Sequence, residues 1–348
     1  MNYTHLKRKH WKEFDVEEYD KDVYPTPFIK RGEYVGYPYG WDKNKNQFIE
    51  GDDKQNFPSA SQWTNTIVQS IHCLVVQCDN QEEVIPTPPE RKKFSYDFPP
   101  SMIELMESNI TKSDLITKQW EKIFTKDPHP LVFAFFSSLE KQIEYNTTSG
   151  EDKRETYTDK WVTDLLRCLG CDSYKGRFRV NPSEEYSFRI AGKICKAILD
   201  IRVDDKYLNI MCWFDESKRL KPSHTPYEDQ IKCQKVAETI AFANSIRDIA
   251  KGRDVEVFCI GARHTFISFS HTIVPISYLD CISNKGIQEL DDPNCHIIHK
   301  IHTKNSENIK YPHGYDITNP IDRKVIIEFL WNIFGYIASE GIFRANSN

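Results

Sequence analysis

The feature of this sequence that most constrains its fold is a regular alternation of helical and extended patterns from residue 150 onward. Three segments place apolar residues at helical spacing: 153–169, about 227–251 and about 321–340. Four segments have the apolar composition of strands: 186–203, 208–214, 255–261 and 265–274. This order of elements predicts an α/β domain over about 150–345, with a mixed central sheet flanked by helices.

Two of these segments are predicted to form a hairpin, with 196–203 and 208–214 as adjacent antiparallel strands. The turn residues Asp204, Asp205 and Lys206 separate them. A two-residue turn at Asp205 and Lys206 would set the register of the whole hairpin. The resulting pairs are Val203 with Leu208, Asp200 with Met211, and Cys195 with Glu216.

The first 149 residues are less regular. Residues 1–100 are expected to be irregular, and 86–100 combine five prolines with a basic cluster, as an exposed linker does. Limited proteolysis is therefore predicted to cut at 91–93. Residues 101–149 are expected to be a helical segment, with helices at about 101–124 and 131–146, while 63–78 is apolar enough for either a helix or a strand.

Composition limits the classes of protein to consider. Hydrophobic residues make up 39% of the chain and aromatic residues 13%, which is enough for a sizeable core. The longest strongly apolar run, 131–136, is too short to cross a bilayer, and charges follow the N-terminus at once. Ten cysteines in 348 residues do not make a disulfide scaffold. We therefore expect a soluble protein of the cytoplasm or nucleus, with no membrane partner.

A tripeptide of acid, any residue and lysine stands out at the end of an expected strand. Glu216 and Lys218 place a carboxylate and an ammonium on one face, because side chains alternate along a strand. Cleavage of a phosphodiester with a metal needs hard oxygen ligands and profits from a nearby lysine. The tripeptide occurs at least six times in the chain, so the setting at a strand end singles out Glu216. A solvated strand end is the alternative interpretation.

Further motifs stand before and after this tripeptide in a recognisable order. Glu155 precedes a helical run, the pair Gly192-Lys193 leads into a strand, Gln230 and Gln234 lie one turn apart on a helix, and a strand ends at Gly261. In this order the chain resembles the PD-(D/E)XK (restriction-endonuclease-like) superfamily, in particular nuclease-like domains common in some fungal genomes. The resemblance covers about 150–275, and the order of elements carries it.

The resemblance implies a restriction-endonuclease-like core and a role for each matching residue. It implies Mg²⁺ or Mn²⁺ as cofactor and DNA or RNA as substrate. The implied roles are catalysis by Glu216 and Lys218, metal binding by Glu155, Asp200 and Glu216, and substrate contact by Gln230, Gln234 and Arg219. With a net charge of −5, nucleic acid would be bound through a local basic patch, for which Lys218, Arg219, Lys221, Lys232 and Lys235 are candidates. Acids at a helix start and solvated glutamines or lysines are ordinary surface features that account for the same residues.

The chain departs from the family pattern at one metal ligand. The residue two after Gly192-Lys193 is aspartate in the family and Cys195 here, and thiols are poor ligands for Mg²⁺. Asp200 is the next candidate, but the predicted register places it about 17 Å along the strand from the position facing Glu216, and on the other face. An inactive module that binds nucleic acid or a protein partner is therefore the alternative to a nuclease. On this register, Cys195→Asp should recreate a ligand pair with Glu216.

A zinc site is the rival interpretation of the cysteines and histidines. Cys168 and Cys171 have metal-ligand spacing, and four residues further along the chain could complete the set: Cys295, His296, His299 and His302. The two groups are far apart in sequence, and the three histidines are expected on different strand faces.

Overall fold

The computed structural model describes the greater part of the chain. The described residues are 41–42, 47–48, 57–63, 67–68, 71–78, 81–84, 98–147, 154–173, 176–190, 192–205, 212–216, 227–285, 297–302, 314–340 and 343–344.

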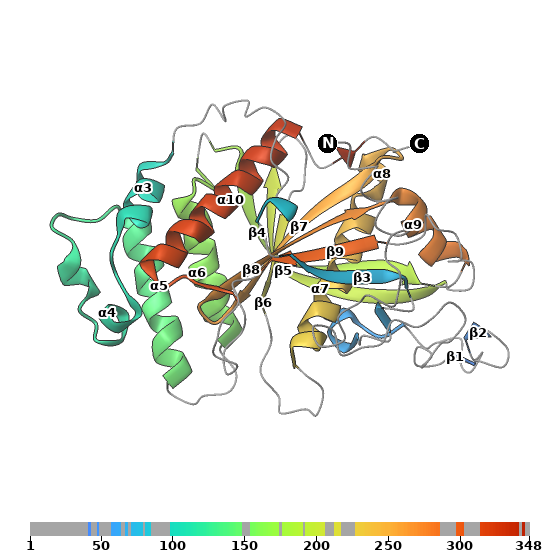
Figure 1. Cartoon of the computed structure of the whole chain (residues 1–348), viewed down its shortest axis with the longest axis horizontal. Helices are drawn as coiled ribbons and strands as arrows, with labels where there is room; N and C mark the ends of the chain where they lie inside the picture. Colours follow the sequence, from blue (N-terminus) through green and yellow to red (C-terminus); the bar gives the residue numbers. More distant parts are fainter. Residues whose placement is uncertain are drawn as a thin grey trace.

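A nine-stranded mixed sheet organises most of the described part, and β1 (Trp41–Asp42) and β2 (Gln47–Phe48) form a separate two-stranded sheet (Figure 1). The strands of the mixed sheet are β3 (Cys73–Cys78), β4 (Phe178–Ile190), β5 (Lys193–Asp205), β6 (Cys212–Glu216), β7 (Asp254–Arg263), β8 (Phe266–Val274), β9 (Ile297–His302), β10 (Tyr315–Asp316) and β11 (Phe343–Arg344). The order across the sheet is β3-β9-β8-β7-β6-β5-β4, with β10 beside β8 and β11 beside β7. The pairs β3–β9 and β6–β7 are parallel, and the other pairs are antiparallel. The predicted α/β class with a mixed sheet is thus confirmed.

The helices lie on both faces of this sheet (Figure 1). They are α3 (Pro100–Glu107), α4 (Lys112–Ile116), α5 (Pro130–Thr147), α6 (Arg154–Cys168), α7 (Tyr227–Ser245), α8 (Arg247–Ala250), α9 (Ile276–Asp280) and α10 (Pro320–Glu340). Tyr336 of α10 packs on Phe258 of β7, with ring centroids 5.7 Å apart, whereas Lys235 of α7 lies over Gly261. Positions 258 and 261 are on opposite faces of a strand, so α10 and α7 cover opposite sides of the sheet.

The helical periodicity read from the sequence corresponds to real buried stripes. In α6, Trp161, Leu165 and Cys168 are fully buried at helical spacing. Helix α7 is buried on most sides over its second half, where Ala237 and Ala241 allow close approach of its neighbours. No helix in the described ranges is long and apolar enough to span a membrane.

The helix expected over 101–124 is wrong, because the segment breaks into α3, α4 and the 3-10 turn η3 (Trp120–Ile123). A capping box starts α4: the Thr111 backbone N–H and hydroxyl donate to Asp114, and the Asp114 N–H donates back to Thr111. The break before it is held by Arg323 of α10, a fully buried side chain that donates to the carbonyls of Ser108 and Ile110. The sequence pattern contains no signal for this distant contact.

The strand-like segment expected over 186–203 is extended, as predicted, but it holds parts of two strands, because β4 and β5 form a hairpin within it. The turn falls at Gly192, whose φ of +77° suits glycine. The two apolar runs around Gly192 continue one alternating pattern, so periodicity alone did not reveal the reversal.

Part of the region expected to be irregular contributes to the core. Residues 73–78 form strand β3, which pairs with β9 at the sheet edge and answers the helix-or-strand question for 63–78 in favour of a strand there. The Phe57 N–H donates to the Ile194 carbonyl at 3.0 Å, and Trp63 packs on Phe188 with ring centroids 6.1 Å apart. The proposed linker lies outside the described residues up to residue 97.

Candidate functional site

The register between β5 and β6 decides which acidic residues can meet. The two strands are antiparallel neighbours, as predicted, but Val203 lies opposite Cys212, not Leu208. The predicted register is therefore wrong by four residues. The ladder includes Arg202 with Trp213 and Ile201 with Phe214, and one further step places Asp200 opposite Asp215. Asp200 thus lies one residue, not about 17 Å, from the position facing Glu216.

The corrected register keeps one part of the earlier reasoning. A shift by an even number of residues leaves the alternation of faces unchanged. Continued by two steps, the ladder places Leu199 opposite Glu216, so Asp200 and Glu216 remain out of phase. The position that directly faces Glu216 is therefore held by a leucine that is fully buried.

A row of positions crosses four neighbouring strands at this level. In the parallel pair, Asp215 lies beside Gly261 and Glu216 beside Ala262. In the next pair, Gly261 lies beside Ser268. The row therefore runs from Asp200 through Asp215 and Gly261 to Ser268, and we call it the Asp200–Ser268 row. It lies near the carboxyl ends of β6 and β7, where open α/β sheets bind their ligands.

Lys235 of α7 reaches this row. Its Nζ lies 3.0 Å from the Ser268 Oγ. A Cβ added to Gly261 would stand 1.9 Å from the same Nζ, so only glycine leaves room for the ammonium. Lys235 is 5% exposed, which corrects the expectation that it lies on an exposed basic patch.

Gln234, the neighbour of Lys235 on α7, makes a bond within its own helix. Its Nε2 donates to the Glu238 Oε1 at 2.7 Å, and Glu238 is buried. Gln234 is half buried.

For three of the other predicted site residues the structure gives the position along the backbone, and two lie outside the described residues. Glu155 is the second residue of α6, Glu216 ends β6, and Gln230 lies in the first turn of α7. Lys218 and Arg219 lie outside the described residues. The described side chains contain no group of three or more His, Cys, Asp or Glu residues arranged to hold a metal.

Cys195, at the position of the missing family aspartate, is a core residue. It is fully buried, its Sγ lies 3.1 Å from the Pro58 carbonyl oxygen, and it lies opposite Phe188 on β4. Burial raises the pKa of its thiol to about 12. On the observed register it does not face Glu216, which corrects the predicted Cys195–Glu216 pair and removes the basis for Cys195→Asp as a repair.

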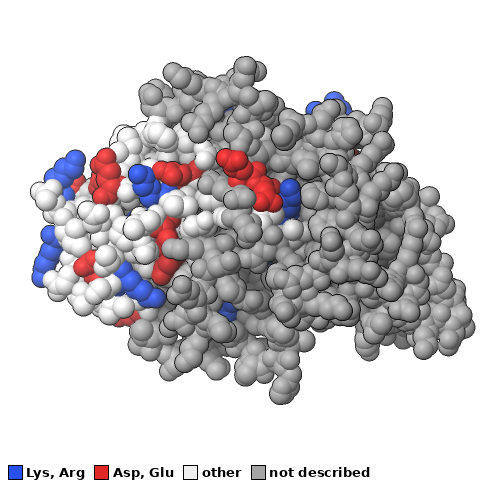
Figure 2. Space-filling view, viewed as in Figure 1, with Lys and Arg blue, Asp and Glu red and all other residues white. Residues whose placement is uncertain are grey.

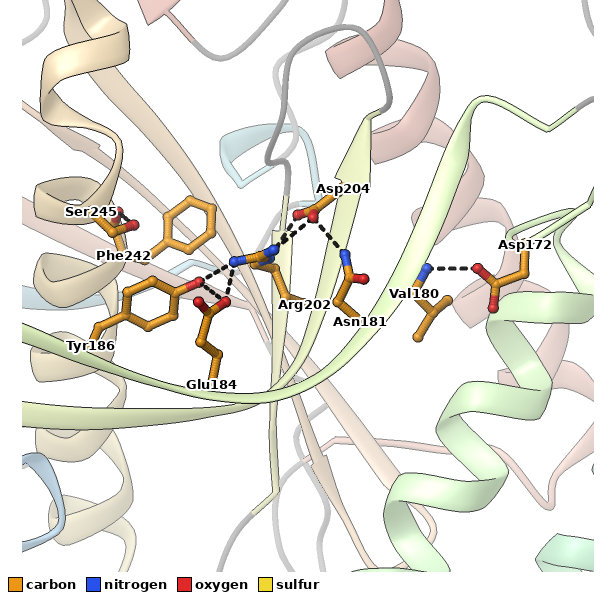
Figure 3. A network of polar contacts seen from close by, with 9 residues as sticks. All are labelled: Asp172, Val180, Asn181, Glu184, Tyr186, Arg202, Asp204, Phe242 and Ser245. Atoms are coloured by element: carbon orange, nitrogen blue, oxygen red, sulfur yellow. Dashed lines mark hydrogen bonds and ion pairs between the residues drawn. The ribbon is translucent and has the colours of Figure 1, made fainter.

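A polar network follows Asp200 along β5 (Figure 3). Arg202 donates to the Tyr186 hydroxyl and to the Glu184 carboxylate on one side, and to Asp204 at 2.8 Å on the other. Burial raises the pKa of Asp204 and that of Tyr186, the latter to about 12. The Arg202 guanidinium therefore joins β5 to the edge strand β4. Its three partners, Glu184, Tyr186 and Asp204, all belong to the β4–β5 hairpin.

The residues considered for zinc are used elsewhere. Cys168 and Cys171 are buried at the end of α6, and burial raises the pKa of both thiols. His299 bonds to the Thr272 hydroxyl at 2.8 Å, while His302 bonds to the Cys78 carbonyl and Tyr315 hydroxyl and stacks on Phe329 of α10. His299 and His302 therefore lie on opposite faces of β9, as expected. Cys295 and His296 lie outside the described residues.

Charged side chains of both signs lie on the visible part of the described surface (Figure 2). Figure 2 shows acidic and basic side chains interspersed over the helical end of the described surface. Nucleic acid would therefore find no extended basic patch on the described residues of this face. The chain matches no protein-family model, and no curated protein matches it.

Sequence reasoning named Lys235 only as a candidate for a local basic patch, and it gave Asp215 no role. The signal was present in part, since Asp215 directly precedes Glu216 and Gly261 ends an apolar strand. What brings Asp200, Asp215 and Lys235 to one level is the pairing of β5, β6 and β7, together with the position of α7 over β7.

Proposed function

We propose that this protein is a metal-dependent phosphodiesterase of the nuclease type, acting on DNA or RNA. The register of β5 against β6 carries the proposal, because it removes the separation that counted against Asp200. Neighbouring strands lie about 4.8 Å apart, so acidic residues opposite each other can share an ion whose oxygen ligands lie at roughly 2–2.5 Å.

The topology supports the resemblance to PD-(D/E)XK nucleases. The order α6, β4, β5, β6, α7, β7 matches the order of motifs from which the resemblance was drawn. Strands β4, β5 and β6 form an antiparallel meander, and β7 joins it in parallel through α7.

The donor set at this level fits a hard divalent cation. Asp200 and Asp215 occupy opposite positions on one face of the sheet, and carboxylate oxygens suit Mg²⁺ or Mn²⁺; Glu216, on the other face of β6, and Glu155 are the further acids of the family pattern. When bound, such an ion would polarise a phosphoryl oxygen and lower the pKa of water. In this proposal Lys218 balances the charge that develops on the phosphate, and Arg219, Gln230 and Gln234 contact the nucleic acid.

A second function is favoured by a different observation. The family aspartate is replaced by Cys195, which is buried in the core, and the residue that continues the ladder opposite Glu216 is Leu199. A chain that keeps the fold without the ligand set would bind nucleic acid or a protein partner and cleave nothing.

Metal binding and cleavage test the two functions together. We expect Mn²⁺ binding by calorimetry, and Mn²⁺-dependent cleavage of single- or double-stranded DNA or RNA, from the wild-type protein. Asp200→Asn and Asp215→Asn should each weaken Mn²⁺ binding by at least about tenfold, because each removes a charged ligand. Asp248→Asn, at an exposed position on α8, is the matched control and should change nothing.

The opposite result is equally specific. A folded wild-type protein that neither binds Mn²⁺ nor cleaves any of these substrates would refute the phosphodiesterase. Salt-sensitive binding of an oligonucleotide by the same protein would then assign the non-catalytic module.

A further inference from the structure

We propose that Lys235 is a further cation of this site that contacts phosphate, and that Gly261 and Ser268 are positioning residues that hold its ammonium at the strand ends. The inference deepens the proposed function and rests on it. The ligand group is a backbone phosphate of a nucleic acid.

The geometry gives Lys235 a place built for its side chain. The Nζ lies directly over Gly261. A Cβ added at Gly261 would lie 1.9 Å from this Nζ and 2.8 Å from the Ser268 Oγ. Gly261 is paired on one side with Ser268 and on the other with Asp215. The ammonium is therefore centred on the Asp200–Ser268 row, one strand from Asp215 and two from Asp200.

Lys235 is buried and has no ion pair with any residue that the structure describes, which is unusual for a lysine. The side chain is 5% exposed, and Ser268 is the hydrogen-bond partner of Nζ among the described residues. A hydroxyl satisfies one of the three N–H donors of an ammonium and does not offset its charge. A buried charge is costly unless it is paired, so this position favours an arriving anion.

The neighbouring groups leave that role open. Glu238, one turn further along α7, accepts a hydrogen bond from the Gln234 amide at 2.7 Å. His299 bonds to Thr272, and burial, followed by the charge of Lys235, lowers its pKa to about 3. His299 is therefore neutral near pH 7 and neither competes with nor neutralises the ammonium.

Charge balance explains why a phosphate would be the anion. A divalent cation held by the carboxylates of the row would neutralise them and leave Lys235 the positive group next to the bound ion. A phosphodiester that reaches the ion with one oxygen can then meet the ammonium with another.

The test measures oligonucleotide binding in Ca²⁺, a cation that takes the same oxygen ligands and can neutralise the row, and repeats each titration in EDTA. A fluorescein-labelled single-stranded DNA is titrated with the wild-type protein, Lys235→Met, Gly261→Ala and Ser268→Ala, using anisotropy at several salt concentrations. Lys324→Met, which removes an exposed lysine from α10, is the matched control. Circular dichroism melting checks that each variant is folded.

We expect Lys235→Met to weaken binding at least about fivefold and to reduce the slope of log K against log salt by about 0.7, the value for one phosphate contact on a single strand. A structural role for Lys235 would lower the melting temperature without changing this slope. Gly261→Ala should weaken binding in the same direction, because the added Cβ displaces the ammonium and leaves its charge in place. Lys324→Met should match the wild type.

Wild-type affinity and slope in Lys235→Met would overturn the inference. If that variant does not fold, Ser268→Ala decides, because it removes the positioning hydroxyl and keeps the lysine: weaker binding supports the inference and unchanged binding refutes it. Failure of the proposed function is seen separately, as an absence of Mn²⁺ binding and cleavage in the wild-type protein.

Discussion

Replacing Cys195 by aspartate distinguishes the observed strand register from the one that the sequence suggested. On the suggested register the new carboxylate would face Glu216 and build a metal site. On the observed register it would enter the core between β4 and the segment around Pro58, beside Phe188. The same substitution is therefore expected to destabilise the protein and to create no metal site.

The cost follows from the environment of the thiol. Burial is the main cause that raises the pKa of Cys195 from 9.0 to about 12, and each step of one in pKa corresponds to about 1.36 kcal/mol. An anion at this position is thus disfavoured by roughly 4 kcal/mol, a large share of the 5–15 kcal/mol that stabilises a typical domain. The same burial would raise the folded-state pKa of the new carboxyl above its usual value of about 3.9.

The pH dependence has a definite sign. A raised carboxyl pKa in the folded state means that the charge penalty is absent below the usual carboxyl pKa of about 3.9 and grows until the pH has passed the raised folded-state pKa. Urea unfolding of Cys195→Asp and Cys195→Asn should therefore give equal stability near pH 4. At pH 8 the aspartate variant should be about 4 kcal/mol less stable than the asparagine variant. Wild-type stability at pH 8, together with new Mn²⁺ binding, would refute the register and the reasoning built on it.

Two further outcomes follow from the packing. Arg323→Met should lower the free energy of unfolding by about 3 kcal/mol, because it leaves the carbonyls of Ser108 and Ile110 without their charged donor. Urea unfolding at pH 7 measures this free energy. A loss below about 0.5 kcal/mol would contradict the prediction. Proteolysis at 91–93 should leave both fragments associated in native gel filtration, because β3 is hydrogen-bonded to β9, and separate them only in denaturant. Fragments that part under native conditions would show that the β3–β9 pairing is not stable.

Local pattern was sufficient for several elements. The helices α6, α7 and α10 and the strands β7 and β8 were predicted close to their bounds, because each buries a face whose period can be read from neighbouring residues. The α/β class followed from their order. Glu155, Glu216, Gln230 and Gln234 were also assigned to the correct types of element.

Distant contacts were beyond the reach of the same patterns. The pairing of β3 with β9 joins residues more than two hundred positions apart, and the break between α3 and α4 is held by Arg323 from the last long helix. Lys235 looks like a solvated lysine on a helix until Gly261 is found beneath it. Each of these depends on which surface a segment meets, and a sequence window does not contain that surface.

The register of β5 on β6 shows most clearly where the sequence ended and tertiary structure took over. The alternation of apolar residues determined which face of each strand is buried, and that part of the prediction survived. A shift of four residues keeps every side chain on its own face, so the pattern is compatible with Val203 opposite either Leu208 or Cys212. Only the tertiary structure, which places β6 beside β7 and Lys235 of α7 over Gly261, selected the register that brings Asp200 level with Asp215 and Lys235.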